Sequence, residues 1–246
     1  MISLEARQLH QTYGVTTALA DVSLHVPAGQ VVALVGQSGS GKTTLLRSFN
    51  RMVEPGSGTV LVDGRDVRAV PVTTLRRQLG YVPQNGGLLP HWDIRRNTAL
   101  VPVLQGRADA LARADAALDL VGLSPATFGA RFPRQLSGGQ RQRAALARAL
   151  AAEQQAILLD EAFGALDAIS RAELHETFGE LRRKRAFTAV LVTHDLVEAA
   201  RLADRIGVMM AGRMEQFGTL AELQAAPTPY VARLLDHARA ASYVIS

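Results

Sequence analysis

The sequence predicts an α/β fold with a mostly parallel sheet covered by helices, interrupted by an inserted helical block. Apolar runs of strand length occupy residues 31–35, 156–159, 189–193 and 205–210. Helical patterns fill residues 170–183 and 196–202 between the last three runs. Strands that alternate with helices favour a parallel sheet with both faces covered. We therefore expect one domain, residues 1–246, whose core comprises residues 1–87 and 153–246 and whose helical subdomain comprises residues 88–152.

The other expected elements rest on local signals. Strands at residues 23–26 and 31–35 flank Pro27-Ala28-Gly29, a turn signal, and a strand at residues 59–62 runs into Asp63-Gly64. Apolar residues recur at helical spacing within residues 108–121.

Two more helical segments complete the expected fold. Residues 138–152 are helical in pattern and rich in alanine, and an amphipathic segment at residues 230–238 is expected to pack against the domain.

Composition narrows the class of protein. The chain is 48% hydrophobic, contains no cysteine, and has no apolar run near the roughly 20 residues of a membrane-spanning helix. Disulfides and thiol catalysis are therefore excluded, and the N-terminus lacks the profile of a signal peptide. A net charge of +5 is compatible with nucleic acid or an anionic membrane. The arginines are scattered, however, so we expect that the chain binds no nucleic acid. The lack of a membrane-spanning run and of a signal-peptide profile leads us to expect a cytoplasmic protein.

The strongest functional signal is a phosphate-binding loop. Residues 36–43 fit the pattern G-x-x-x-x-G-K-[ST], between an apolar strand and a segment that can open a helix. Glycines let the backbone wrap around phosphates, and the helix presents its positive end to them. Lys42 would reach the β- and γ-phosphates of ATP, and Thr43 would ligate Mg²⁺. The expected nucleotide-binding residues here are Gly36, Gln37, Ser38, Gly39, Ser40, Gly41, Lys42, Thr43 and Thr44.

Two carboxylates follow a second apolar strand. Asp160, at the carboxyl end of the run at residues 156–159, is a candidate for holding Mg²⁺ through water. Glu161 follows where the chain leaves the sheet, and a carboxylate facing the γ-phosphate can accept a proton from the attacking water.

One segment resembles a specific family. Residues 136–143, Leu-Ser-Gly-Gly-Gln-Arg-Gln-Arg, resemble the signature motif of ABC ATPases. A serine and glycines at a helix N-terminus are suited to bind an anion. The resemblance implies a P-loop NTPase core of the RecA type, with an antiparallel β subdomain and an inserted helical subdomain. It also implies a head-to-tail homodimer in which Ser137, Gly138, Gly139 and Gln140 complete the ATP site of the opposite subunit.

Further residues match the family's motifs in the expected order. Tyr13 resembles the aromatic residue that stacks on adenine, and Gln84 the glutamine that senses the γ-phosphate and contacts the metal. Residues 165–167 resemble the loop that touches the other subunit, with Asp167 at its end. His194 resembles the histidine that contacts the γ-phosphate. Ala162 departs from the pattern, because the family usually has proline after the glutamate.

The choice of transporter rests on longer segments. Residues 85–97, 99–102, 131–135 and 163–171 resemble the ATPases of quaternary-amine importers, which carry glycine betaine, choline or carnitine. The resemblance implies a transmembrane permease partner, a substrate-binding protein, and a peripheral position at the cytoplasmic face of the membrane. Importers of methionine, sulfonates or polyamines share the same core motifs and remain alternatives. Many members carry paired C-terminal regulatory domains, and this sequence is expected to contain none.

Two other classes of function are less favoured by the sequence. A non-transport ABC ATPase of translation or DNA repair would join two ATPase halves or insert a long coiled coil, and 246 residues accommodate neither. A regulatory nucleotide-binding module without turnover would not need Glu161 and His194. We therefore expect an ATPase coupled to transport.

Overall fold

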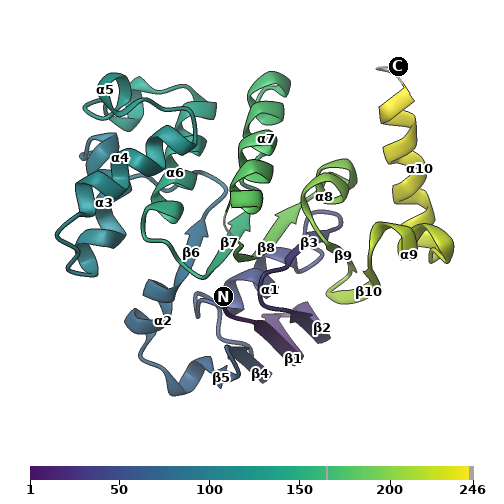
Figure 1. Ribbon diagram of the computed structural model, residues 1–246. Coiled ribbons are helices and arrows are strands. Elements are labelled where there is room, and N and C mark those ends of the chain that lie inside the picture. The colour runs from purple at the N-terminus through teal and green to yellow at the C-terminus, as the bar shows by residue number, and fades with distance from the viewer. Residues whose placement is uncertain (165, 185, 244–246) are drawn as a thin grey trace. The chain divides into compact units, whose positions relative to one another are not determined.

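The computed structural model describes residues 1–164, 166–184 and 186–243, which form two compact units (Figure 1). One unit contains residues 73–187 together with Met1, and we call it the helical unit. The other contains residues 2–72 and the chain from residue 188 onward, and we call it the P-loop unit.

A parallel sheet forms the centre of the P-loop unit. Strand β3 (Val31–Val35) lies between β8 (Thr188–Thr193) and β9 (Arg205–Met210) and is parallel to both. All five residues of β3 are buried, as expected of an unbroken Val/Leu/Ala run in a sheet covered on both faces. Strand β10 (Arg213–Gly218) pairs antiparallel with β9. Helices α1 (Lys42–Ser48) and α8 (Leu196–Leu202) follow β3 and β8.

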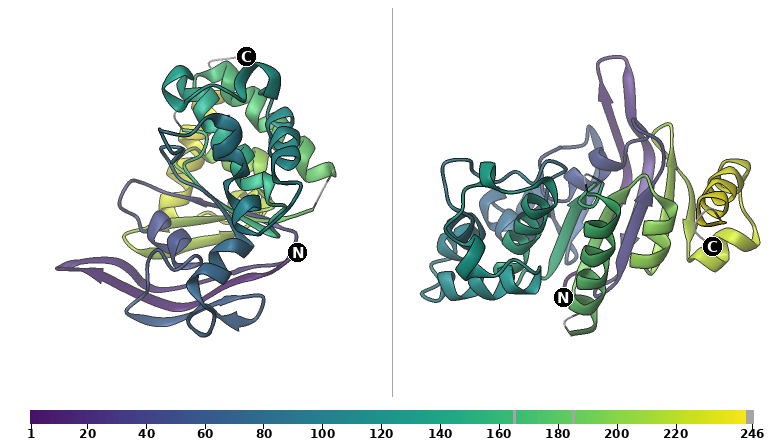
Figure 2. Two further views of the ribbon diagram at one scale, coloured as in Figure 1. Left: turned by 90° about the vertical axis from the view of Figure 1, so that its left-hand side faces the viewer. Right: turned by 90° about the horizontal axis from the view of Figure 1, so that it is seen from above.

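A second, antiparallel sheet belongs to the same unit. Its strand order is β2-β1-β4-β5, with β1 at Leu4–Tyr13, β2 at Thr16–Val26, β4 at Ser57–Val62 and β5 at Arg65–Asp66. Residues of β2 alternate between buried and exposed, the pattern of a strand with one solvated face. Figure 2 shows β1 and β2 as a long ribbon with a projecting turn, where Gly14 adopts φ +57°. A short 3₁₀ helix, η1 (Val67–Ala69), follows β5.

The C-terminal helices also belong to the P-loop unit. Helix α9 (Leu220–Ala225) begins with a capping box of Thr219 and Glu222, and α10 (Pro229–Tyr243) follows. Val231 and Leu235 of α10 are buried, so the amphipathic segment packs against its own unit as expected.

The helical unit combines two parallel strands with a helical block. Strands β6 (Leu79–Val82) and β7 (Ala156–Asp160) pair in register, and α2 (Val72–Gln78) leads into β6. Between them lie α3 (Ile94–Leu104), α4 (Ala110–Leu120), α5 (Pro125–Phe128), η2 (Pro133–Gln135) and α6 (Gly138–Ala151). Small buried alanines of α4 and α6 allow α3, α4 and α6 to pack together. Helix α7 (Ala168–Lys184) follows β7.

The predicted fold class is confirmed, with some elements missed. Neither β10 nor the full length of β1 was predicted, because exposed polar residues interrupt their apolar positions. Helix α3 was also missed, since Pro102 lies inside it. The expected subdomain limits, residues 88 and 152, stay a prediction. Among the residues that the structure describes, no helix combines the length and apolar character needed to cross a bilayer.

Candidate functional site

The predicted phosphate-binding loop connects β3 to α1 through three glycines with positive φ: Gly36 at 153°, Gly39 at 78° and Gly41 at 101°. A side chain at Gly36 would lie 2.2 Å from the carbonyl oxygen of Met209, and one at Gly41 would lie 2.3 Å from that of Ala18. Both positions therefore require glycine for space as well as for conformation. Gln37, Ser38 and Gly39 are exposed, so the crest of the loop faces solvent.

Lys42 is held by its own loop. The side chain is 5% exposed, and its Nζ donates to the carbonyl oxygens of Gly36 (2.7 Å) and Gln37 (2.8 Å) and to Ser40 Oγ (3.3 Å). A buried ammonium requires such oxygen partners, because an uncompensated charge in the interior is costly. The arrangement keeps a positive charge under the loop. Thr43 and Thr44, in the first turn of α1, are half-buried.

The β1–β2 hairpin lies against this loop. Ala18 and Leu19 of β2 contact the space beside Gly41, and the amide of Ala20 donates to the carbonyl oxygen of Gly212 (2.8 Å). Tyr13 ends β1 at the hairpin turn, opposite Thr16, and is 52% exposed. The structure thus places an accessible tyrosine ring at the end of a hairpin that packs on the phosphate loop.

His194 leaves the sheet at the same edge as the loop. Strands β3 and β8 are parallel and in register, with Val35 opposite Thr193. The next residues, Gly36 and His194, therefore both lie at the carboxyl edge, where ligands of open α/β sheets bind. His194 is exposed, and Asp195 caps α8 by accepting from the amides of residues 197 and 198.

In the helical unit, the two candidate carboxylates have specific partners. Asp160, at the end of β7, is 1% exposed, and its Oδ2 accepts from the hydroxyl of Tyr81 on β6 (3.1 Å). Glu161 accepts from Gln84, with 2.6 Å between Gln84 Nε2 and Glu161 Oε2. Gln84 and Glu161 follow neighbouring strands, so the parallel pairing of β6 and β7 brings them into contact.

Glu161 also has an unusual backbone. Its φ is +49°, in the left-handed region that residues other than glycine rarely adopt. Its carbonyl oxygen accepts from the amide of Gly164 (3.2 Å), which closes a tight turn over Ala162. Such strain persists where surrounding contacts hold it, and here Phe163 is fully buried against the His175 ring, with 5.0 Å between ring centroids.

The signature segment begins α6. Ser137 Oγ accepts from the amide of Gln140 (3.2 Å), while Gln140 Oε1 accepts from the amide of Ser137 (3.1 Å), a reciprocal capping box. Ser137 and Gly138 are exposed, so this helix end faces solvent. Helix α6 runs for 14 residues, long enough for its dipole to favour an anion there.

Asp167 lies beside the signature segment. A side chain added at Gly139 would contact Leu166 and Ser170 at 3.4 Å, so the start of α7 packs close to α6. Asp167 Oδ1 accepts from the amide of Ser170 (3.0 Å), and this bond lowers the pKa of Asp167. Ala165, the first residue of the expected loop at residues 165–167, lies outside the described residues.

The candidate residues therefore form two sets. The P-loop unit carries Tyr13, residues 36–44 and His194, and the helical unit carries Gln84, residues 137–140, Asp160, Glu161 and Asp167. In the described part of the chain, no group of three His, Cys, Asp or Glu side chains is placed to hold a metal. The lack of a three-ligand group is compatible with Mg²⁺, because this ion keeps several waters and is bound through one or two protein ligands plus substrate phosphates.

Three residues of this region were missed in the sequence. Besides Tyr81, Arg148 of α6 donates to the carbonyl oxygens of Gly87 (2.7 Å) and Gly86 (2.9 Å), and burial lowers the pKa of its guanidinium. Asn97 of α3, with no exposed surface, holds the loop at residues 89–93. The only sequence signal for these contacts was the pair Gly86-Gly87, because glycine carbonyls are easily reached by a long side chain such as arginine.

Comparison with known proteins identifies the family of the chain. The family model described as ABC transporter matches residues 19–164. A glycine betaine uptake system ATP-binding protein of Escherichia coli is 43% identical over 217 residues, which are 87% of this chain and 70% of that protein. The chain belongs to the ABC transporter family. The predicted membership is thereby confirmed, and the resemblance to quaternary-amine importer ATPases is shared by a relative whose name includes glycine betaine.

Other relatives of this ABC protein are similarly close. A sulfate/thiosulfate import ATP-binding protein of Mycolicibacterium paratuberculosis is 46% identical, over 92% of this chain and 62% of that protein. An osmoprotectant import ATP-binding protein of Salmonella typhimurium is 41% identical, over 92% of this chain and 61% of that protein. The chain therefore spans less than two thirds of the length of these two relatives.

Solved structures agree on the fold. The dimeric structure of a bacterial ABC transporter cassette superposes with a TM-score of 0.82 at 31% identity, covering 88% of this chain and 98% of that one. A dimeric post-hydrolysis state of the same cassette, bound to ADP and phosphate, also gives 0.82.

Proposed function

We propose that the chain is the ATP-hydrolysing subunit of an ABC importer and acts as a homodimer beneath a transmembrane permease. The observation that carries this proposal is the buried Lys42 ammonium, held under a three-glycine loop by the loop's own oxygens. A triphosphate offers better charge compensation than carbonyl oxygens, so Lys42 would turn to the β- and γ-phosphates. The loop amides and the N-terminus of α1 would hold the remaining phosphate oxygens.

The remaining groups have roles that follow from their chemistry. Mg²⁺, ligated by Thr43 and approached by Asp160 and Gln84, would neutralise charge on the phosphates. Glu161 would accept the proton of the attacking water, and the 2.6 Å contact to Gln84 would set the orientation of its carboxylate. His194 would donate to the γ-phosphate from the carboxyl edge of the sheet, and the exposed ring of Tyr13 would stack on adenine.

The exposed signature helix supports a dimer. Ser137 and Gly138 cap a 14-residue helix at its solvent-facing end, where an anion is favoured. In the proposed head-to-tail dimer, residues 137–140 of one protomer would bind the nucleotide held by the other, with Asp167 at the interface. The similar cassette structures are dimeric, which supports this arrangement.

The names of the relatives support import as the coupled process. They include uptake of glycine betaine, import of osmoprotectants, and transport of carnitine and choline. We therefore infer a quaternary-amine substrate, a substrate-binding protein as a further partner, and a peripheral position at the cytoplasmic face of the membrane. The segment at residues 85–97, clamped by Arg148 and Asn97, would meet the permease.

A test of the catalytic proposal uses Glu161→Gln. Loss of a general base should slow phosphate release by roughly 10²–10⁴-fold while ATP binding is kept. Glu180→Gln is the matched control, because Glu180 is an exposed carboxylate of α7 that pairs only weakly with Lys184 (3.9 Å). It should hydrolyse ATP like the unaltered chain. Equal turnover in the two variants would remove Glu161 from the proposed role.

Sulfate is the second candidate substrate, favoured by a relative that is 46% identical and named for sulfate/thiosulfate import. The complex of this chain with its permease, reconstituted in vesicles, separates the two. ATP-dependent uptake of labelled glycine betaine without labelled sulfate supports the first proposal, and the reverse result supports the second.

A further inference from the structure

Tyr81 of β6 contacts one of the two carboxylates proposed for the ATP site. Its hydroxyl donates to Asp160 Oδ2 (3.1 Å), and Asp160 is 1% exposed. The two residues are 79 positions apart in the sequence, so their contact depends on the sheet rather than on a local motif. Asp160 has a proposed role toward Mg²⁺, whereas none of the motifs in the sequence assigns a role to Tyr81.

The register of β6 and β7 brings these two side chains together. Tyr81 lies opposite Leu158, and Asp160 is two residues further along β7 on the same face of the sheet. Two residues of a strand span roughly 6.6 Å, so the short hydroxyl of a serine or threonine at position 81 would not reach the carboxylate. A phenol hydroxyl, at the far end of its ring, spans this distance.

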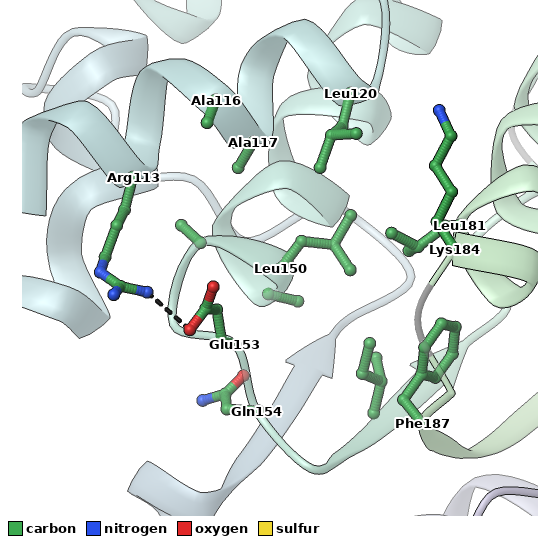
Figure 3. A pocket seen from close by; sticks show the side chains of 13 residues that line it. Arg113, Ala116, Ala117, Leu120, Leu150, Glu153, Gln154, Leu181, Lys184 and Phe187 are labelled. Atoms are coloured by element: carbon green, nitrogen blue, oxygen red, sulfur yellow. Dashed lines mark ion pairs between the residues drawn. The ribbon is translucent and has the colours of Figure 1, made fainter.

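The opposite face of the same strands packs toward α6. Ile157 lines a pocket together with Leu150 and Phe187, both labelled in Figure 3. A side chain at Gly80, which lies opposite Ile157, would lie 3.4 Å from Ala149 Cβ on α6. Because side chains alternate along a strand, the next residue of each strand points away from α6. The tyrosine and the aspartate therefore meet on the face of the sheet that is turned away from this pocket.

A phenol is a suitable partner for a carboxylate that acts beside a cation. One hydrogen bond to Oδ2 restricts rotation about the Cβ–Cγ bond of Asp160 and so restricts both carboxylate oxygens. A lysine or arginine in place of Tyr81 would also orient the carboxylate, but its charge would oppose the attraction of Mg²⁺. The phenol hydroxyl is an uncharged donor, so it orients the carboxylate without adding positive charge.

We propose that Tyr81 is a positioning residue of the ATP site, whose hydroxyl holds the Asp160 carboxylate in the orientation in which it approaches the Mg²⁺ of the bound nucleotide. This inference rests on the proposed function, because it needs Asp160 on the metal side of the site. Strand β6 then supplies a donor to each of the two carboxylates, since Gln84 donates to Glu161. Replacing a residue that orients a metal ligand typically weakens metal binding by about 10–100-fold. Asp160 is proposed to act through water, so we expect a loss of about tenfold.

The metal affinity of the nucleotide-bound chain tests this role. The full chain is held in excess over AMP-PNP, a non-hydrolysable analogue of ATP, and Mn²⁺ replaces Mg²⁺ so that EPR can follow the free ion. Tyr81→Phe should bind Mn²⁺ about tenfold more weakly than the unaltered chain. Its affinity for AMP-PNP in EDTA, measured by calorimetry, should equal that of the unaltered chain, because the predicted phosphate-binding loop is unchanged. Equal weakening of both affinities would indicate a structural role and overturn the proposal.

Tyr230→Phe is the matched control. It removes a buried hydroxyl that has no hydrogen-bond partner and belongs to the P-loop unit, and it should bind Mn²⁺ like the unaltered chain. Should Tyr81→Phe not fold, Tyr81→Met provides the same test, because it also replaces the phenol with an apolar side chain that has no donor.

Asp160→Asn separates this inference from the proposed function. If Asp160→Asn weakens Mn²⁺ binding and Tyr81→Phe does not, the positioning role of Tyr81 is refuted while the role of Asp160 stands. If Asp160→Asn binds Mn²⁺ like the unaltered chain, the proposed metal role of Asp160 fails, and the role of Tyr81 fails with it. Weaker Mn²⁺ binding by both variants, with unchanged AMP-PNP affinity in EDTA, supports the proposal.

Discussion

The hydrogen bonds of the Asn97 amide to the loop at residues 89–93 should contribute measurably to the free energy of unfolding. Asn97 has no exposed surface, and its Nδ2 lies 3.0 Å from each of the carbonyl oxygens of Leu89, Trp92 and Asp93. Its Oδ1 accepts from the amide of Leu89 (2.7 Å). The nitrogen has two hydrogens, so at most three strong bonds exist at once. At about 0.5–1.5 kcal/mol each, Asn97→Ala should lower the free energy of unfolding by about 2–4 kcal/mol.

Urea unfolding followed by tryptophan emission is the assay. Trp92 is the only tryptophan of the chain and lies in the loop itself, so its emission reports on this segment. Asn97→Asp keeps the size of the side chain but puts an oxygen in place of the donating nitrogen, facing the three carbonyl oxygens, and it should be at least as destabilising as Asn97→Ala. Asn85→Ala, at an exposed position nearby, should change stability by less than about 0.5 kcal/mol.

The reasoning would be refuted if Asn97→Ala unfolded at the same urea concentration as the unaltered chain with unchanged Trp92 emission. If the loop also meets a permease as proposed, Asn97→Ala should reduce permease-stimulated ATP hydrolysis more than basal hydrolysis.

Three further outcomes are expected. Lys42→Ala should abolish tight ATP binding in calorimetry, because the loop loses its buried cation; unchanged affinity would contradict this. Gly41→Ala should destabilise the chain more than Gly39→Ala in urea unfolding. Both distort left-handed backbone, but only a side chain at Gly41 meets the carbonyl oxygen of Ala18 (2.3 Å), and equal losses would count against the close packing. The amide of Thr219 donates to the Glu222 carboxylate and lowers its pKa below the unfolded value of about 4.3. The stabilisation from this bond is therefore present above pH of about 4.3, and it should be lost as the pH falls through the lower pKa of the folded state. Glu222→Gln should flatten that part of the stability–pH curve, and an unchanged slope would argue against the contact.

Local sequence patterns predicted the parallel part of the fold closely. The strands at Val31–Val35 and Arg205–Met210 and the helix at Leu196–Leu202 have the predicted limits. The strands are mostly apolar runs, and the helix places its apolar residues at helical spacing. Strand β10 and the proline-containing α3 were not predicted, since tertiary packing rather than local pattern stabilises them.

The candidate site likewise has parts that the local sequence predicts and parts that only tertiary contacts create. Residues 36–43 are contiguous, so their loop could be predicted from the motif alone. The contact between Gln84 and Glu161 depends on β6 pairing with β7, and the positive φ of Glu161 depends on how Phe163 is buried. Neither can be predicted from the local sequence, because both arise from contacts between distant segments.

The central claim is that the signature helix of one protomer binds the ATP of the other, and light scattering of the Glu161→Gln chain with Mg²⁺ and ATP tests it most directly. The mass should rise to twice the 26.3 kDa of one chain. Adding Ser137→Asp keeps a residue that caps α6 but places a carboxylate against the triphosphate, and this chain should stay monomeric. Ser124→Asp, at the start of α5, adds the same charge elsewhere and should still dimerise. A Glu161→Gln chain that remains at the mass of one protomer, or a dimer indifferent to Ser137→Asp, would contradict the claim.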